Sequence, residues 1–188
     1  MSDLPLFPLN TVLFPGGRLP LRVFEQRYME MVKACLKNNT LFGVCLIREG
    51  KEVGMPATPV EVGCLARIGD WDMPQFGMLH ITARGEQRFR ILARRVQPDG
   101  LARADVEFLP EDTDAMVPDE WGRCVRLLER VIEQQGALFD PPHLLQSCSW
   151  ISSRLAEVLP LPLDAKQELL ELTDARARLQ RLNALLGH

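Results

Sequence analysis

Residues 4–31, LPLFPLNTVLFPGGRLPLRVFEQRYMEM, decide the fold of this chain. Pro5 and Pro8 interrupt an apolar run that begins at Leu4 and favours a strand. Because proline has no backbone N–H to donate to a sheet ladder, this strand is expected to lie at a sheet edge or to bend. The sequence Phe-Pro-Gly-Gly at residues 14–17 then predicts a tight turn, since proline fixes one torsion angle and glycine permits a positive φ.

The spacing of the apolar residues changes after this turn. They first alternate with other residues, a pattern that predicts a half-buried strand: Leu19, Leu21 and Val23. After Phe24 they recur at helical spacing, which predicts an amphipathic helix: Tyr28, Met31, Val32 and Cys35. The opening of the chain therefore predicts a strand, a turn, a second strand and a helix in quick succession.

Short apolar stretches separated by turn residues continue from residue 42 to residue 109. Residues 69–77 read as a break between strands, and Arg84-Gly85-Glu86 reads as the turn of a hairpin. Strands at this spacing predict an antiparallel barrel or sandwich.

The second half of the chain has a different pattern. Residues 110–119 are acidic and contain two prolines, and beyond them apolar residues recur at helical spacing. We therefore predict a β domain over residues 1–112 and a helical domain over residues 113–188. The acidic segment is expected to be the main protease-sensitive connector, because its prolines and charges leave little to pack or pair.

Three segments carry a resemblance to a known family. They are the Leu-Pro-rich opening with its Phe-Pro-Gly and Leu-Pro-Leu, the sequence GEQRFRI at residues 85–91, and the tail with LPL at 159–161, KQELLE at 166–171 and Arg178-Leu179. In this order they resemble the N-terminal, substrate-binding domain of the ATP-dependent Lon proteases. The resemblance implies an α+β fold, with a PUA-like antiparallel β-barrel, one packed helix and a C-terminal helical bundle.

Composition indicates an ordinary globular protein of 188 residues with a net charge of −3 and 46% apolar residues. This charge does not favour nucleic acid or an anionic membrane as a partner. We find no secretory signal and no apolar run of the roughly 20 residues that span a bilayer. The five cysteines form no CxxC pair, which favours packed, reduced thiols in a cytoplasmic protein. The oligomeric state is not indicated.

The catalytic machinery of a Lon protease is missing from the sequence. A P-loop needs Gly-x-x-x-x-Gly-Lys-Ser/Thr, whereas the single Gly-Lys pair, Gly50-Lys51, is followed by Glu52. The serine and lysine of the peptidase belong to a domain that would follow an ATPase module, and the sequence stops at His188. We therefore expect a free-standing recognition module that is not an enzyme and holds no cofactor.

A cysteine hydrolase is the least favoured of three hypotheses about function, after polypeptide binding and RNA binding. It would need a thiolate beside a histidine base. The histidines are His80, His143 and His188, and no cysteine lies in a nucleophile motif. No Cys/His pair has the spacing of zinc ligands. The sequence therefore predicts neither catalytic residues nor a metal site.

The alternative hypothesis is an RNA-binding PUA-like module. Arg88, Arg90 and Arg94 share strand parity and are expected to project from one face. Acidic residues are interleaved with them, and exposed aromatic residues for base stacking are not evident, so a solvated barrel face is the simpler interpretation. Nucleic acid is therefore not the expected partner.

The strongest candidate site is the predicted loop at residues 69–77, GDWDMPQFG. Large apolar side chains in a loop are costly unless they fold back or bind something. The candidate peptide-binding residues are Trp71, Met73 and Phe76, with Met55 on a second apolar loop. In the alternative reading Trp71 caps the barrel end and Phe76 enters the core. We expect non-catalytic binding of a polypeptide client or partner protein, through apolar burial and pairing at an open strand edge.

Overall fold

The computed structural model describes residues 1–186, so His188 lies outside the described residues. The chain folds into two compact units, Met1–Leu109 and Pro110–His188. The sequence-based division between residues 112 and 113 falls just inside the second unit, and the independence of the two domains stays a prediction. No helix within the described residues is long and apolar enough to cross a membrane.

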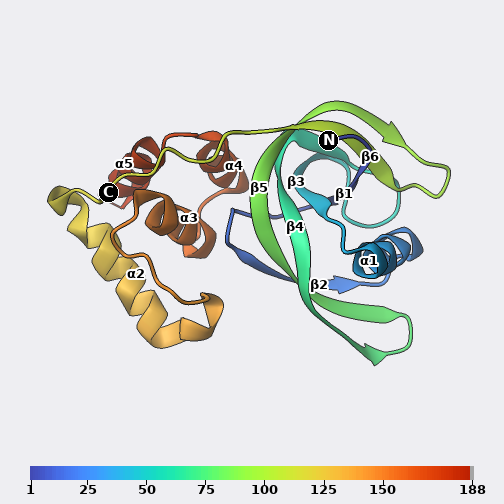
Figure 1. Cartoon of the computed structure of the whole chain (residues 1–188), viewed down its shortest axis with the longest axis horizontal. Coiled ribbons are helices and arrows are strands. Elements are labelled where there is room, and N and C mark those ends of the chain that lie inside the picture. The colour runs from blue at the N-terminus through green and yellow to red at the C-terminus, as the bar shows by residue number, and fades with distance from the viewer. Residues whose placement is uncertain (187–188) are drawn as a thin grey trace. The chain divides into compact units, whose positions relative to one another are not determined.

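The first unit is a barrel with one helix (Figure 1). Its elements are β1 (Leu4–Leu9), β2 (Arg18–Val23), α1 (Gln26–Asn38), β3 (Phe42–Glu49), β4 (Thr58–Gln75), β5 (Met78–Val96) and β6 (Ala102–Phe108). The strand order is β2-β5-β4-β3-β1-β6, and an additional pairing of β5 with β6 closes the barrel. The predicted α+β class is confirmed. One ladder, between β1 and β3, is parallel, which differs from the antiparallel barrel that the strand spacing predicts.

Strand β1 lies between β3 and β6, so of the two expectations for it, an edge position or a bend, the edge position is wrong. Leu4 and Pro5 pair with β6, whereas Leu6–Leu9 pair with β3. The strand changes partner after Pro5, and Pro8 lies opposite Cys45 inside the short ladder with β3. The second strand, β2, pairs with β5 alone among the described residues and carries Pro20 at this sheet edge, as edge strands tolerate.

The helix α1 covers one side of the barrel with the apolar face that the sequence predicts. The ring of Tyr28 stacks on that of Phe7, with 4.1 Å between centroids. The core between helix and barrel includes Phe7, Leu9, Tyr28, Met31, Val32, Cys35, Phe42, Leu79 and Ile81. A second cluster fills the barrel from the other side: Leu4, Leu6, Cys45, Leu65, Phe89, Ala102, Ala104 and Val106.

The predicted hairpin around Arg84-Gly85-Glu86 is wrong, because β5 runs through these residues as one strand. Gly85 is required for a different reason. The N–H of Gly16 donates to the carbonyl of Gly85 over 2.8 Å, and the N–H of Gly85 donates to that of Gly17 over 2.9 Å. A Cβ at Gly85 would lie 2.1 Å from the carbonyl oxygen of Phe14. The glycine lets the turn at residues 14–17 close onto the strand.

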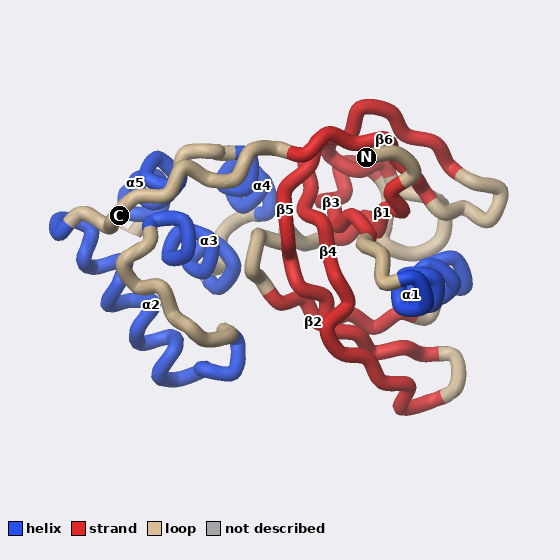
Figure 2. The backbone as a smooth tube through the Cα atoms, viewed as in Figure 1, coloured by secondary structure: helices blue, strands red, loops and turns tan. Residues whose placement is uncertain are grey.

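The prediction that residues 69–77 form a loop between two strands is also wrong. Strand β4 continues to Gln75 and pairs with β5, with Trp71 opposite Ile81 and Gln75 opposite Met78. Figure 2 shows β4 and β5 running on beyond the barrel as a pair of strands joined by a short loop. We call residues 69–82 the hairpin arm, although Leu79 and Ile81, on its β5 side, still pair with β2 and belong to the core.

The second unit is the expected helical bundle. Its elements are the 3-10 helices η1 (Asp119–Trp121) and η2 (Gly136–Leu138) and the helices α2 (Gly122–Gln135), α3 (Cys148–Val158), α4 (Leu163–Glu171) and α5 (Ala175–Leu185). Its buried apolar side chains include Trp121, Cys124, Leu128, Cys148, Ile151, Leu155, Leu169, Leu170, Leu179 and Leu182.

The acidic segment at residues 110–119 makes hydrogen bonds to the helices of this unit, whereas the sequence predicted that it has little to pack or pair with. The Asp112 carboxylate accepts from Arg178 Nη1 at 2.6 Å and from Nη2 at 2.8 Å. Asp114 accepts from the Ser147 hydroxyl at 2.7 Å and from the backbone N–H of Ser149 at 2.9 Å. The same carboxylates that suggested a solvated linker therefore attach this segment to the rest of the helical unit.

A buried carboxyl in this unit makes its stability depend on pH. Burial raises the pKa of Glu157 from its ordinary 4.5 to about 7, although Arg154 and Lys166 pull it down. Its side chain is 19% exposed and lies 2.9 Å from Arg154 Nη2. Between these two pKa values the folded state therefore holds a proton that the unfolded state has released.

We accordingly expect the contribution of Glu157 to be present below pH 4.5 and to be lost as the pH rises through about 7. Since each unit of pKa difference corresponds to about 1.36 kcal/mol, the free energy of unfolding should fall by about 3 kcal/mol over this range. The check is urea unfolding of wild type and Glu157→Gln at several pH values. Their difference in unfolding free energy should change over this window, and a constant difference would contradict the assignment.

Candidate functional site

The hairpin arm exposes a cluster of large apolar side chains. Trp71 is 58% exposed, Met73 40% and Phe76 fully exposed at 102%. The alternative reading, in which Trp71 caps the barrel end and Phe76 enters the core, is therefore wrong. Exposed apolar clusters of this kind commonly mark binding surfaces.

Backbone geometry explains why these side chains stay outside. Gln75 and Met78 are paired, so Phe76 and Gly77 alone form the turn, and Gly77 has a φ of +84°. A two-residue turn of this kind leaves its first side chain at the tip, away from the strands below. Trp71 lies opposite Ile81 and shares its face, but Ile81 belongs to the core whereas Trp71 lies beyond it.

The arm also borders a shallow groove of about 530 Å³. The groove crosses β2, β5 and β4 and is lined by Pro20, Leu21, Arg22, Asp70, Trp71, Asp72, His80, Ile81 and Thr82. Strand pairing places Asp72, His80 and Arg22 in one row and Asp70, Thr82 and Pro20 in the next. These rows make the groove polar, and its acidic residues come from β4.

Met55 is exposed, as a binding residue requires, but it is not part of this groove. It lies on the loop between β3 and β4 and lines a separate hollow with Pro56, Gln97 and the first residues of α1. The structure therefore brings Trp71, Met73 and Phe76 together on one arm and leaves Met55 apart from them.

The predicted basic face is not formed. Arg88 is buried at 2% exposure. Arg90 lies 3.6 Å from the carboxylate of Glu107, and Arg94 donates to the carbonyl of Ala57 over 3.1 Å. A β-bulge between Ile91 and Ala93 reverses the alternation of side chains, so Arg90 and Arg94 do not share a face.

The thiols and histidines are poorly placed for covalent chemistry. All five cysteines are buried, and burial raises the pKa of Cys35, Cys124 and Cys148 and that of Cys45 to about 12. A raised pKa disfavours the thiolate that a nucleophile needs. Within residues 1–186, no group of three or more His, Cys, Asp or Glu side chains is placed to hold a metal ion.

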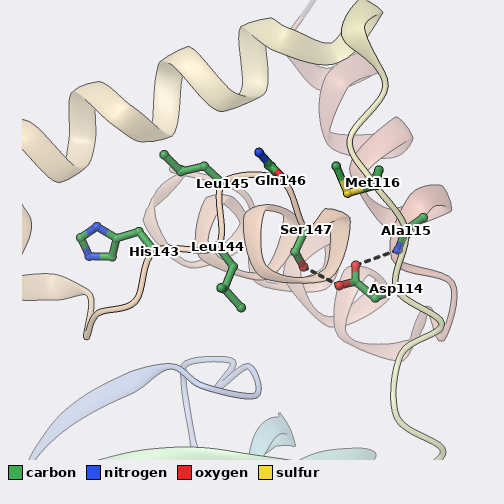
Figure 3. A pocket seen from close by; sticks show the side chains of 8 residues that line it. All are labelled: Asp114, Ala115, Met116, His143, Leu144, Leu145, Gln146 and Ser147. Atoms are coloured by element: carbon green, nitrogen blue, oxygen red, sulfur yellow. Dashed lines mark hydrogen bonds between the residues drawn. The ribbon is translucent and has the colours of Figure 1, made fainter.

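Sequence reasoning missed a second groove, of about 510 Å³, in the helical unit (Figure 3). Residues 114–116 form one side and residues 143–147 the other, and both Met116 and Leu144 are exposed. Leu144 precedes the helix α3, which begins only at Cys148. The carboxylate of Asp114 accepts hydrogen bonds from the backbone N–H groups of Ala115 and Ser149 and from the Ser147 hydroxyl. The rest of the groove surface is mainly apolar.

Comparison with known proteins defines the class of this chain. The family model for the substrate-binding domain of ATP-dependent protease La (LON) matches residues 3–188. A Lon protease from Paraburkholderia phytofirmans is 31% identical over 200 aligned residues, which cover 100% of this chain and 25% of that protease. The Danio rerio protein cereblon is 30% identical over 59% of this chain and 26% of its own length.

Solved structures agree with these sequence matches. The crystal structure of a Lon N-terminal domain protein from Xanthomonas campestris superposes with a TM-score of 0.82 and 37% identity, covering 98% of both chains. The chain belongs to the family of Lon substrate-binding domains. It spans about a quarter of the length of the Lon proteases that it matches.

Proposed function

We propose that this protein is a non-catalytic module that binds extended, apolar polypeptide segments on its hairpin arm. The exposure of Trp71, Met73 and Phe76 on one strand-paired hairpin carries the proposal. Trp and Met suit such recognition because one offers a large flat area with a polar handle and the other an adaptable, polarizable surface. Membership of the Lon substrate-binding domain family supports a protein client as ligand.

Substitution of Trp71 by alanine should weaken peptide binding roughly 30-fold, because a central aromatic anchor contributes about 2 kcal/mol or more to such an interface. The melting temperature should stay close to that of wild type, since Trp71 is mostly exposed and lies outside the core. The measurement is a fluorescence titration of a labelled, unstructured, Leu-rich peptide into the full chain.

Leu92→Ala is the matched control, because Leu92 is a large exposed apolar residue on β5 far along the strand from the arm. It should leave the affinity unchanged. Equal affinity of wild type and Trp71→Ala would remove the arm from the binding site. Tight binding of single-stranded RNA without binding of peptide would move the function to the RNA-binding alternative.

A further inference from the structure

The hairpin arm has an open strand edge. Strand β4 pairs with β3 only as far as Ala66, and from Arg67 to Gln75 its pairing, among the described residues, is with β5 alone. Among the described residues the edge of β2 is open too, but it carries Pro20 in its middle, whereas the proline of the β4 edge, Pro74, is the last residue but one of its strand. Because proline cannot donate to a ladder, the β4 edge is the better template for an added strand.

The side chains along this edge divide by chemistry. Trp71 pairs with Ile81 on one face of the arm, whereas Asp70 and Asp72 pair with Thr82 and His80 on the other. Met73 follows Asp72 at a shift in register and lies opposite neither carboxylate's partner. A strand added beside β4 would alternate in the same way. Its apolar residues would meet Trp71 and Met73 while the intervening residues met the two carboxylates.

The two carboxylates lack the cationic partners that others in the barrel unit have. Arginine partners are found for Asp3, Glu25, Glu86 and Glu107. In the part of the chain that the structure describes, no ion pair is found for Asp70 or Asp72, and Asp72 accepts only from the backbone N–H of Met73. In the cross-strand row of Asp72, the nearest charged residue is Arg22. It lies on β2, two strands or roughly 10 Å away.

From this open edge and its unpaired charge we propose that the preferred client is an extended segment in which basic residues alternate with apolar ones. The segment pairs as an added strand with residues 69–75 of β4, places its basic side chains beside Asp70 and Asp72, and covers Trp71 and Met73 with its apolar side chains. A cation beside Asp72 lies about 5 Å from β4 but twice to three times as far from Arg22, so attraction outweighs repulsion there. Beside Asp70 the attraction is weaker, because Arg84 shares this face and lies next to Gly69. This inference rests on the proposed polypeptide binding and names its substrate class.

The test uses two short synthetic peptides with identical leucines, one alternating them with lysine and the other with glutamate. Fluorescence anisotropy with the full chain should show the lysine peptide binding about tenfold more tightly, because two cross-strand charge pairs change sign. Salt should reduce this difference. The Asp70→Asn/Asp72→Asn double variant should abolish it while keeping the affinity for the glutamate peptide at least as high as in wild type.

Glu49→Gln/Glu61→Gln is the control for general attraction by negative charge, since both residues are exposed and lie on β3 and the barrel part of β4. It should keep the preference for lysine. N-methylation of alternate residues of the lysine peptide, in the two possible registers, should abolish binding in one register, as strand pairing requires.

Equal affinities of the two peptides, with binding still lost in Trp71→Ala, would overturn this inference and leave the proposed function standing. A lysine preference that survives in the Asp70→Asn/Asp72→Asn variant would also overturn it. Binding of neither peptide would refute the proposed function itself.

Discussion

Substitution of Arg178 by methionine is expected to destabilise the helical unit by about 3–5 kcal/mol, the usual effect of leaving a buried charge without its partner. The Arg178 side chain is 2% exposed and that of Asp112 10%. Its guanidinium also donates to the carbonyls of Leu169 and Leu172, over 2.9 and 2.7 Å. The variant therefore removes the hydrogen bonds from the guanidinium to these two carbonyls and takes the buried Asp112 carboxylate away from its cationic partner, although the Ser149 hydroxyl still donates to Asp112 over 2.8 Å.

The measurement is urea unfolding followed by tryptophan fluorescence, since Trp121 and Trp150 both lie in this unit. Arg181→Ala is the control, because Arg181 is exposed on the same helix, and it should change the unfolding free energy by less than about 0.5 kcal/mol. Arg178→Met combined with Asp112→Leu should recover part of the loss, as it removes both charges. A loss below about 1 kcal/mol for Arg178→Met alone would contradict the ion pair's role.

The second large effect is expected at Gly85. Gly85→Ala should cost the barrel unit about 3 kcal/mol, because the new methyl group would lie 2.1 Å from a backbone carbonyl oxygen that cannot move aside freely. Either the turn at residues 14–17 or the strand has to shift, and both hydrogen bonds between them would weaken.

Gly69→Ala is the matched control on the neighbouring strand. A Cβ there would first meet the Arg84 side chain, at 3.1 Å from Nε, and this flexible group can move. Thermal unfolding followed by circular dichroism should therefore show a large drop in melting temperature for Gly85→Ala and a small one for Gly69→Ala. Similar melting temperatures for the two variants would show that the turn and strand approach each other less closely than the structure places them.

The errors of prediction have a common physical origin in contacts between distant segments. Hydrophobic alternation and helical spacing are local, and they predicted the strand β2 and the helix α1 correctly. Gly85 resembled a hairpin turn because a glycine between charged residues is a local turn signal. Its real role depends on a turn some 70 residues earlier in the chain, which no local pattern contains.

The same limit applies to the candidate site. The sequence predicted that Trp71, Met73 and Phe76 are close together, but local composition could not decide whether they fold back or face solvent. The pairing of Gln75 with Met78 decides it, since it makes Phe76 part of a two-residue turn. Likewise, strand parity placed Arg90 and Arg94 on one face, and a single bulged residue between them removed that face.

Mapping of amide chemical shifts by NMR tests the central claim most directly. The full chain, labelled with nitrogen-15, is titrated with the lysine–leucine peptide, and the change at each backbone amide is followed. We expect the largest changes at residues 69–80, on the hairpin arm, and little change in the helical unit. Changes centred on residues 114–116 and 143–147, with the arm unaffected, would contradict the account and place the binding site in the groove of the helical unit.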